Sequence, residues 1–167
     1  SIHLVFAGHP ELAVDKFTWL FLGSHGRREA VPGSDVDVAI AFDDDVSPET
    51  MELFRRAFGE VNELLTAAGL GVDVNGANAS NKAFSRTNSE WRAAATRWLT
   101  APGDHSRAAM AVHRTGLAVI ASLLVDARPV HGTPGLPEVA RVFTDFRQHP
   151  AAVDLLLSES LSHRAKE

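Results

Sequence analysis

A short strand that carries two acids is the feature that most constrains this fold. In residues 35–42 (DVDVAIAF), apolar residues alternate with two aspartates and two alanines. This period of two is typical of a half-buried strand. Asp35 and Asp37 are two residues apart, so their carboxylates would project from one face, opposite the larger apolar side chains. A fold built on this strand must therefore place two carboxylates side by side on one face of the sheet.

Other elements are expected on both sides of this strand. Residues 17–22 form a short apolar run that predicts a buried strand, and residues 24–32 predict a turn or a short helix. Ser47 is a good N-cap for a helix whose apolar residues recur at helical spacing until glycines end it. Residues 69–76 (GLGVDVNG) predict another short strand. The order strand, turn, strand, helix, strand indicates an α/β unit.

The second half of the sequence is expected to be helical. Residues 75–89 (NGANASNKAFSRTNS) are polar and predict a loop. Thr87 and Glu90 have the spacing of a capping box, and the helix after them would carry Trp91 and Trp98 on one apolar face. We interpret the tryptophans as core residues. Three further helices are predicted over residues 107–125, 136–146 and 151–161.

Composition excludes several classes of site. The 167 residues include no cysteine, so neither a disulfide framework nor a thiolate zinc site is possible. The eight histidines lack ligand spacing, and the net charge of −5 argues against bulk electrostatic binding of nucleic acid. No apolar run approaches the roughly 20 residues of a membrane span, and the start lacks the features of a signal peptide. We therefore expect a cytoplasmic location; a start at Ser1 rather than Met fits a fragment.

The acidic pair suits divalent cations. Two residues apart on a strand, the Cα atoms of Asp35 and Asp37 would lie about 6.5–7 Å from each other. Carboxylates that converge from this spacing can share ions, which in two-metal sites lie about 3.5–4 Å apart. Oxygen ligands favour Mg²⁺, with Mn²⁺ as the alternative. A third acid would complete the site. Asp73, on the strand expected at 69–76, is one candidate and Asp126 is the other.

Residues just before the acidic pair suit a phosphate. Gly23 allows close approach of the backbone, and Ser24 offers a hydroxyl and an N–H. Arg27 and Arg28 carry guanidinium groups that match phosphate oxygens. Each feature alone also has an ordinary structural explanation, such as a solvated strand edge, a turn or an exposed ion pair with Glu29. Together they indicate nucleotidyl transfer, which depends on positioning and charge neutralisation.

The joint pattern resembles a known superfamily. Residues 23–40 (GSHGRREAVPGSDVDVAI) look like the signature of DNA polymerase β-like nucleotidyltransferases, in which Gly-Ser precedes Asp-x-Asp among apolar residues. The GS-x-GR-x-E form resembles domains related to the uridylyltransferase that modifies the PII signalling protein. The later segments ANASN, EWRAAATRWL and LLVDARPVHG are similar to the DUF294 group, which often accompanies CBS or cyclic-nucleotide-binding domains. The resemblance runs from about Trp19 to the helix expected after Gly132.

This resemblance implies a fold and a set of site residues. The fold would be α/β (α+β), with a small mixed sheet and flanking helices in a catalytic domain over residues 1–82 and a helical domain over 83–167. Asp35 and Asp37 would bind Mg²⁺. Position favours Asp73 as the third carboxylate, while Asp126 would join Arg128 near the cleft as an element of the second domain. The nucleotide would contact residues near the acidic pair, namely Gly23, Ser24, Arg27, Arg28 and Ser34.

Three functions are compatible with this pattern. The first is a Mg²⁺-dependent nucleotidyltransferase that moves a nucleoside monophosphate from an NTP, such as ATP, to a hydroxyl of an acceptor protein or small molecule. The second is a regulatory nucleotide-binding module without turnover, acting in signal transduction beside sensory domains. The third is a structural or interaction domain, which would not need an acidic strand face. The sequence identifies neither the acceptor nor the base.

Overall fold

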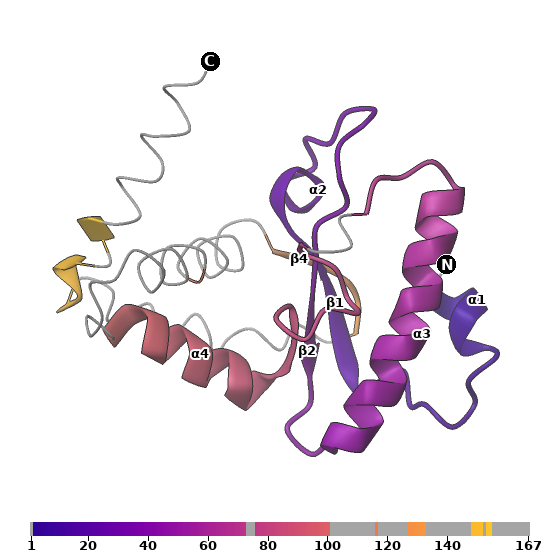
Figure 1. Ribbon diagram of the computed structural model, residues 1–167, viewed down its shortest axis with the longest axis horizontal. Coiled ribbons are helices and arrows are strands. Elements are labelled where there is room, and N and C mark those ends of the chain that lie inside the picture. The colour runs from indigo at the N-terminus through magenta and orange to yellow at the C-terminus, as the bar shows by residue number, and fades with distance from the viewer. Residues whose placement is uncertain are drawn as a thin grey trace.

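A mixed four-stranded sheet with helices on both faces forms the fold (Figure 1). The computed structural model describes residues 2–72, 76–100, 116, 127–132, 148–151 and 153–154, and the statements below concern these residues. The strand order is β3-β2-β1-β4. Strand β1 (Phe17–Phe21) is antiparallel to both β2 (Val38–Phe42) and β4 (Arg128–His131), whereas β3 (Ser85–Thr87) is parallel to β2. The expected α/β class with a small mixed sheet is confirmed.

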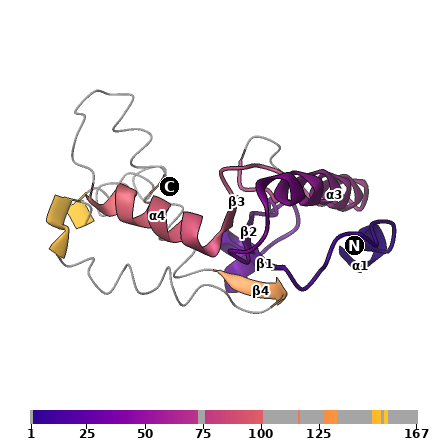
Figure 2. The same ribbon diagram turned by 90° about the horizontal axis from the view of Figure 1, so that it is seen from below.

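Helices cover the two faces of the sheet (Figures 1 and 2). Helices α1 (Ile2–Phe6) and α3 (Pro48–Ala67) lie on one face, and α4 (Asn88–Thr100) lies on the other. The short helix α2 (Gly23–Arg27) follows β1 after a single intervening residue. The loops at this end of the sheet carry the motif residues.

The core has two parts, one on each face of the sheet. On the α3 face, aromatic rings gather around Phe17, whose ring centroid lies 5.0 Å from that of Phe58. On the α4 face, Trp91 is buried against a smaller apolar cluster and donates from Nε1 to the backbone carbonyl of Ile40, at 2.8 Å. All five residues of β2 are buried. The prediction of a half-buried strand was therefore wrong for this part, because α4 covers the alanine face.

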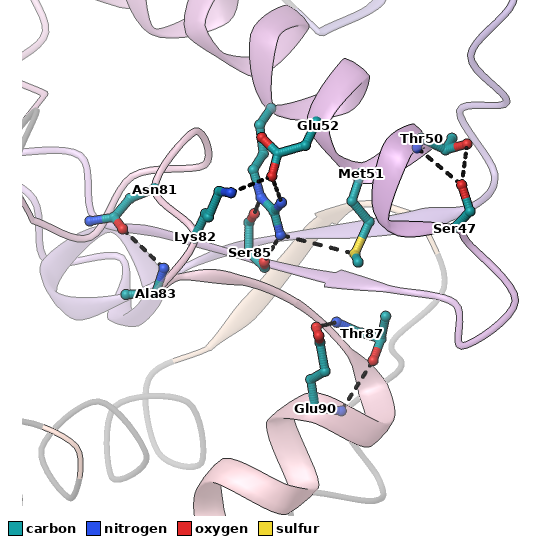
Figure 3. A network of polar contacts seen from close by, with 11 residues as sticks. Ser47, Thr50, Met51, Glu52, Asn81, Lys82, Ala83, Ser85, Thr87 and Glu90 are labelled. Atoms are coloured by element: carbon teal, nitrogen blue, oxygen red, sulfur yellow. Dashed lines mark hydrogen bonds and ion pairs between the residues drawn. The ribbon is translucent and has the colours of Figure 1, made fainter.

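The predicted starts of α3 and α4 are confirmed (Figure 3). The Ser47 hydroxyl accepts from the Thr50 N–H at 3.2 Å and caps α3. At α4, the Glu90 carboxylate accepts from the Thr87 N–H at 2.9 Å, and the Thr87 hydroxyl accepts from the Glu90 N–H at 3.1 Å. Trp91 on the apolar face of α4 is buried as expected, whereas Trp98 is only half-buried. These features are set by residues three apart, which explains why the sequence predicts them well.

The sheet differs from the expectation at its margins. β2 begins at Val38, not at residue 35, and Asp35 forms only an isolated bridge with Gly71. Two separate hydrogen bonds join this segment to residues 71–77. The Gly71 carbonyl accepts from the Val36 N–H at 2.8 Å, and the Ala77 carbonyl accepts from the Val38 N–H at 2.6 Å. Single contacts of this kind do not make a ladder.

Two short strands were missed. β3 lies in the segment predicted to be a polar loop, and β4 lies in the DARPVHG segment that was expected to break a helix. Both are edge strands of three and four residues, too short to show a period. Both strands also follow residue 82, so the sheet contains strands from both sides of the expected domain boundary. The boundary itself stays a prediction. The helices expected over 107–125, 136–146 and 151–161 lie almost entirely outside the described residues.

An arginine ties α3 to the edge strand β3. Arg55 donates from Nε to the Ser85 hydroxyl and from Nη2 to the Ser85 carbonyl, both at 2.7 Å. Glu52 accepts from Arg55 at 2.8 Å and from Lys82 at 2.6 Å (Figure 3). This network fixes the β3 edge, away from α2.

Candidate functional site

The Gly-Ser turn and the acidic pair meet at one end of the sheet. Phe21, the last residue of β1, pairs with Val38, the first residue of β2. Just beyond that pair, the Leu22 N–H donates to the Asp37 carbonyl at 2.9 Å. The chain then turns into α2 at Gly23 and Ser24, both half-buried. Antiparallel pairing thus places the two halves of the motif next to each other, although they are about a dozen residues apart in sequence.

Gly23 lies directly against the side chain of Asp37. A Cβ atom at residue 23 would be 2.9 Å from Asp37 Oδ2, closer than real Cβ contacts come. Gly23 also has a φ of +51°, in the left-handed region that side chains disfavour. Two separate features therefore favour glycine here, and the backbone of residue 23 lies close to a carboxylate.

A second glycine lies against Asp35 in the same way. Gly71 bridges Asp35, and a Cβ on Gly71 would overlap Asp35 Oδ1. Asp35 is exposed and Asp37 is half-buried. Among the described residues, none forms a hydrogen bond or ion pair with the Asp35 carboxylate. An exposed carboxylate oxygen of this kind is a suitable ligand for Mg²⁺ or Mn²⁺.

The third carboxylate has two candidates from the sequence. Asp73 and Asp126, the two candidates from sequence, both lie outside the described residues. The described residues contain no group of three His, Cys, Asp or Glu side chains that could hold a metal. Asp35 and Asp37 would supply two oxygen ligands, as expected for Mg²⁺ that is bound by few protein groups plus substrate phosphates. The identity of the third acid stays a prediction.

The other expected phosphate ligands follow Ser24 in the chain, and side-chain hydrogen bonds are formed by Arg27 and Ser34. Arg27 is exposed, and its Nε donates to Glu29 at 2.7 Å. Arg28 is exposed and adopts a φ of +64° at the C-cap of α2. The Ser34 hydroxyl accepts from the Val31 N–H at 3.0 Å, which closes the turn before Asp35. Contact of these residues with a nucleotide stays a prediction.

Sequence reasoning missed the link between this site and the second half of the chain. Arg128, on β4, donates from Nη2 to the His25 carbonyl in α2 at 3.1 Å. Its guanidinium also lies over the Phe21 ring, 5.6 Å from the centroid. The DARPVHG motif had placed Arg128 near the cleft, but only the pairing of β4 with β1 shows which element it contacts.

A comparison with protein families identifies the family of this chain. The family described as "Putative nucleotidyltransferase DUF294" matches residues 2–105, more than half of the chain. The chain belongs to this family, which confirms the predicted resemblance. A comparison with curated protein sequences gave no match.

Two solved structures are similar to the chain at low identity. A crystal structure of a toxin–antitoxin with AMP-PNP has 10% identity and a TM-score of 0.44, with 96% of this chain and 98% of that chain covered. A mutant of the toxin–antitoxin MntA–HpeT has the same identity and coverage and a TM-score of 0.42.

Proposed function

We propose that this protein transfers a nucleoside monophosphate from an NTP to an acceptor hydroxyl, in a reaction that needs Mg²⁺ or Mn²⁺. The observation that carries the proposal is the contact of Gly23 with the Asp37 carboxylate, reinforced by the hydrogen bond from Leu22 to the Asp37 carbonyl. A phosphate held at Gly23 and Ser24 would lie beside an oxygen ligand for the metal. That proximity is what nucleotidyl transfer requires.

Each site residue has a defined role in this proposal. Asp35 and Asp37 hold the divalent ions, which when bound neutralise charge on the α-phosphate and on the departing pyrophosphate. Ser24 and the backbone at Gly23 donate hydrogen bonds to the triphosphate. The acceptor oxygen forms a bond to the α-phosphorus, the bond from that phosphorus to the bridging oxygen breaks, and pyrophosphate leaves. Asp73 takes the acceptor proton.

The arginines fit a supporting role. Arg27 is paired with Glu29, but both side chains are exposed. Exposed ion pairs contribute about 0–1 kcal/mol, so exchanging Glu29 for a phosphate costs little. A phosphate can accept two parallel hydrogen bonds from one guanidinium. It can therefore compete with the exposed Glu29 carboxylate for Arg27. Arg28 and Ser34 complete the proposed nucleotide contacts.

The test is a transfer assay with matched variants. Wild-type protein is incubated with Mg²⁺, α-labelled NTPs and cell extract, and labelled products are separated by size. We expect label on an acceptor with wild type and its loss in Asp35→Asn and Asp37→Asn. Asp43→Asn is the control, because Asp43 is an exposed acid at the opposite end of β2. No transfer by wild type argues against catalysis. Equal transfer by Asp37→Asn and wild type argues against catalysis at this site.

A measurement of NTP binding beside this assay distinguishes the regulatory alternative from the transferase. NTP binding that depends on Mg²⁺, without transfer to any acceptor, would indicate a nucleotide-binding regulatory module. The acceptor, whether protein or small molecule, and partner sensory domains of the CBS or cyclic-nucleotide-binding kind are part of the proposal, as is a cytoplasmic location. No helix in the described ranges is long and apolar enough to cross a membrane.

A further inference from the structure

Arg128 reaches α2 from a distant part of the chain. It pairs with Phe21 across the β1–β4 ladder, so its backbone is fixed to the last residue before the motif turn. Its guanidinium lies over the Phe21 ring and donates to the His25 carbonyl. The two hydrogen-bonded residues are 103 positions apart in sequence.

Helix α2 depends on contacts of this kind. It has five residues and no side-chain cap at its N-terminus. A helix so short is not stable by its own hydrogen bonds. Two described contacts hold it from outside: at its start the Leu22 N–H donates to Asp37, and towards its end Arg128 donates to the His25 carbonyl. The last carbonyls of a helix carry partial negative charge, so a guanidinium is well matched there.

The contact is not arranged for stability alone. Arg128 Nε and His25 Nε2 are both buried, and neither has a hydrogen-bond partner among the described residues. Burying an unpaired polar atom has a desolvation cost that a smaller apolar residue at position 128 would avoid. The contact does orient the helix: with both ends held, α2 keeps Gly23 at the Asp37 carboxylate, with Ser24 next in the chain.

We propose that Arg128 is a positioning residue for the nucleotide site, which holds α2 so that Gly23 and Ser24 can receive the triphosphate. The inference rests on the proposed function for its kinetic consequence. Its structural part, that Arg128 orders α2, is measurable without any nucleotide.

The first experiment is hydrogen exchange of the protein without ligand. The N–H groups of Gly26, Arg28 and Glu29 donate to carbonyls within this turn of chain. In Arg128→Gln, we expect these amides to exchange about tenfold faster, as loss of one hydrogen bond would produce. Arg128→Lys keeps a cation and a donor, so it should restore part of the protection.

The second experiment measures nucleotide kinetics in the same variants. Arg128→Gln should raise the KM for NTP by about tenfold with a smaller change in kcat. The reason is that Gly23 and Ser24 are displaced while Asp35 and Asp37 stay in place. Arg128→Lys should recover part of the KM.

Arg55→Gln is the matched control, since it also removes an arginine bond to a backbone carbonyl, but on the β3 edge. It should lower the melting temperature without changing exchange in α2 or the KM.

The outcomes separate this inference from the proposed function. Unchanged exchange in α2 of Arg128→Gln overturns the inference, as does a KM change that Arg55→Gln reproduces at equal loss of stability. If wild type binds no NTP, the proposed function fails, and the nucleotide part of the inference fails with it. Transfer by wild type together with normal α2 exchange in Arg128→Gln rejects the inference and leaves the proposed function standing.

Discussion

Replacing Gly23 with alanine separates backbone strain from damage to the site. The residue has a φ of +51°, and an alanine in the left-handed region costs about 1–2 kcal/mol. For a chain of this size, that loss lowers the melting temperature by about 2–8 °C. The added Cβ would also lie 2.9 Å from Asp37 Oδ2, which is 0.5 Å inside the 3.4 Å where ordinary contact begins. The carboxylate or the turn must therefore shift by about half an ångström.

A shift of that size matters for transfer more than for folding. A displacement of about 1 Å in a reacting group can cost about 100-fold in rate, so half of it predicts a loss of about tenfold. Gly69→Ala is the matched control, because Gly69 has a φ of +82° and nothing lies within 4 Å of its Cβ position. Both variants should lose similar stability in thermal melts. Only Gly23→Ala should lose NTP transfer or Mn²⁺ affinity, and equal activity in the two variants would refute the reasoning.

Three further predictions concern the scaffold. Asp44→Ala removes the acceptor of two hydrogen bonds from Ser89; partial burial raises the pKa of Asp44, but these bonds outweigh it and lower the pKa overall. The stability it adds is present above about pH 4 and lost as pH falls, so wild type and variant should converge in acid melts. Thr87→Ala should cost about 1 kcal/mol by uncapping α4, measured by urea unfolding. Trp91→Phe should cost about 1 kcal/mol, because the Ile40 carbonyl loses the indole N–H as a donor; an unchanged midpoint would contradict this.

Local signals account for the parts of the fold that sequence predicted. The caps at Ser47 and Thr87 depend on side chains within three residues, and both are as expected. Contacts between distant segments were missed. One example is Asp44, which accepts from Ser89, 45 residues later, at the start of α4. Nothing local to either residue indicates this contact.

The candidate site shows the same division. The Gly-Ser and Asp-x-Asp motifs identified the class from one stretch of chain, because the residues that define it are close in sequence. The hydrogen bond from Arg128 to α2 depends on β4, whose four residues are too few to show a hydrophobic period. Pairing across the sheet, rather than composition, brings that side chain to α2. The choice between Asp73 and Asp126 is likewise a matter of three-dimensional proximity that neither motif encodes.

The most direct test of the account is metal-dependent nucleotide binding at Asp37. Calorimetry with a non-hydrolysable NTP, with and without Mg²⁺, compares wild type with Asp37→Asn and with the control Asp43→Asn. We expect Mg²⁺ to strengthen binding to wild type and to the control, and Asp37→Asn to lose this gain. Equal Mg²⁺-dependent binding by Asp37→Asn and wild type would contradict the assignment of this carboxylate.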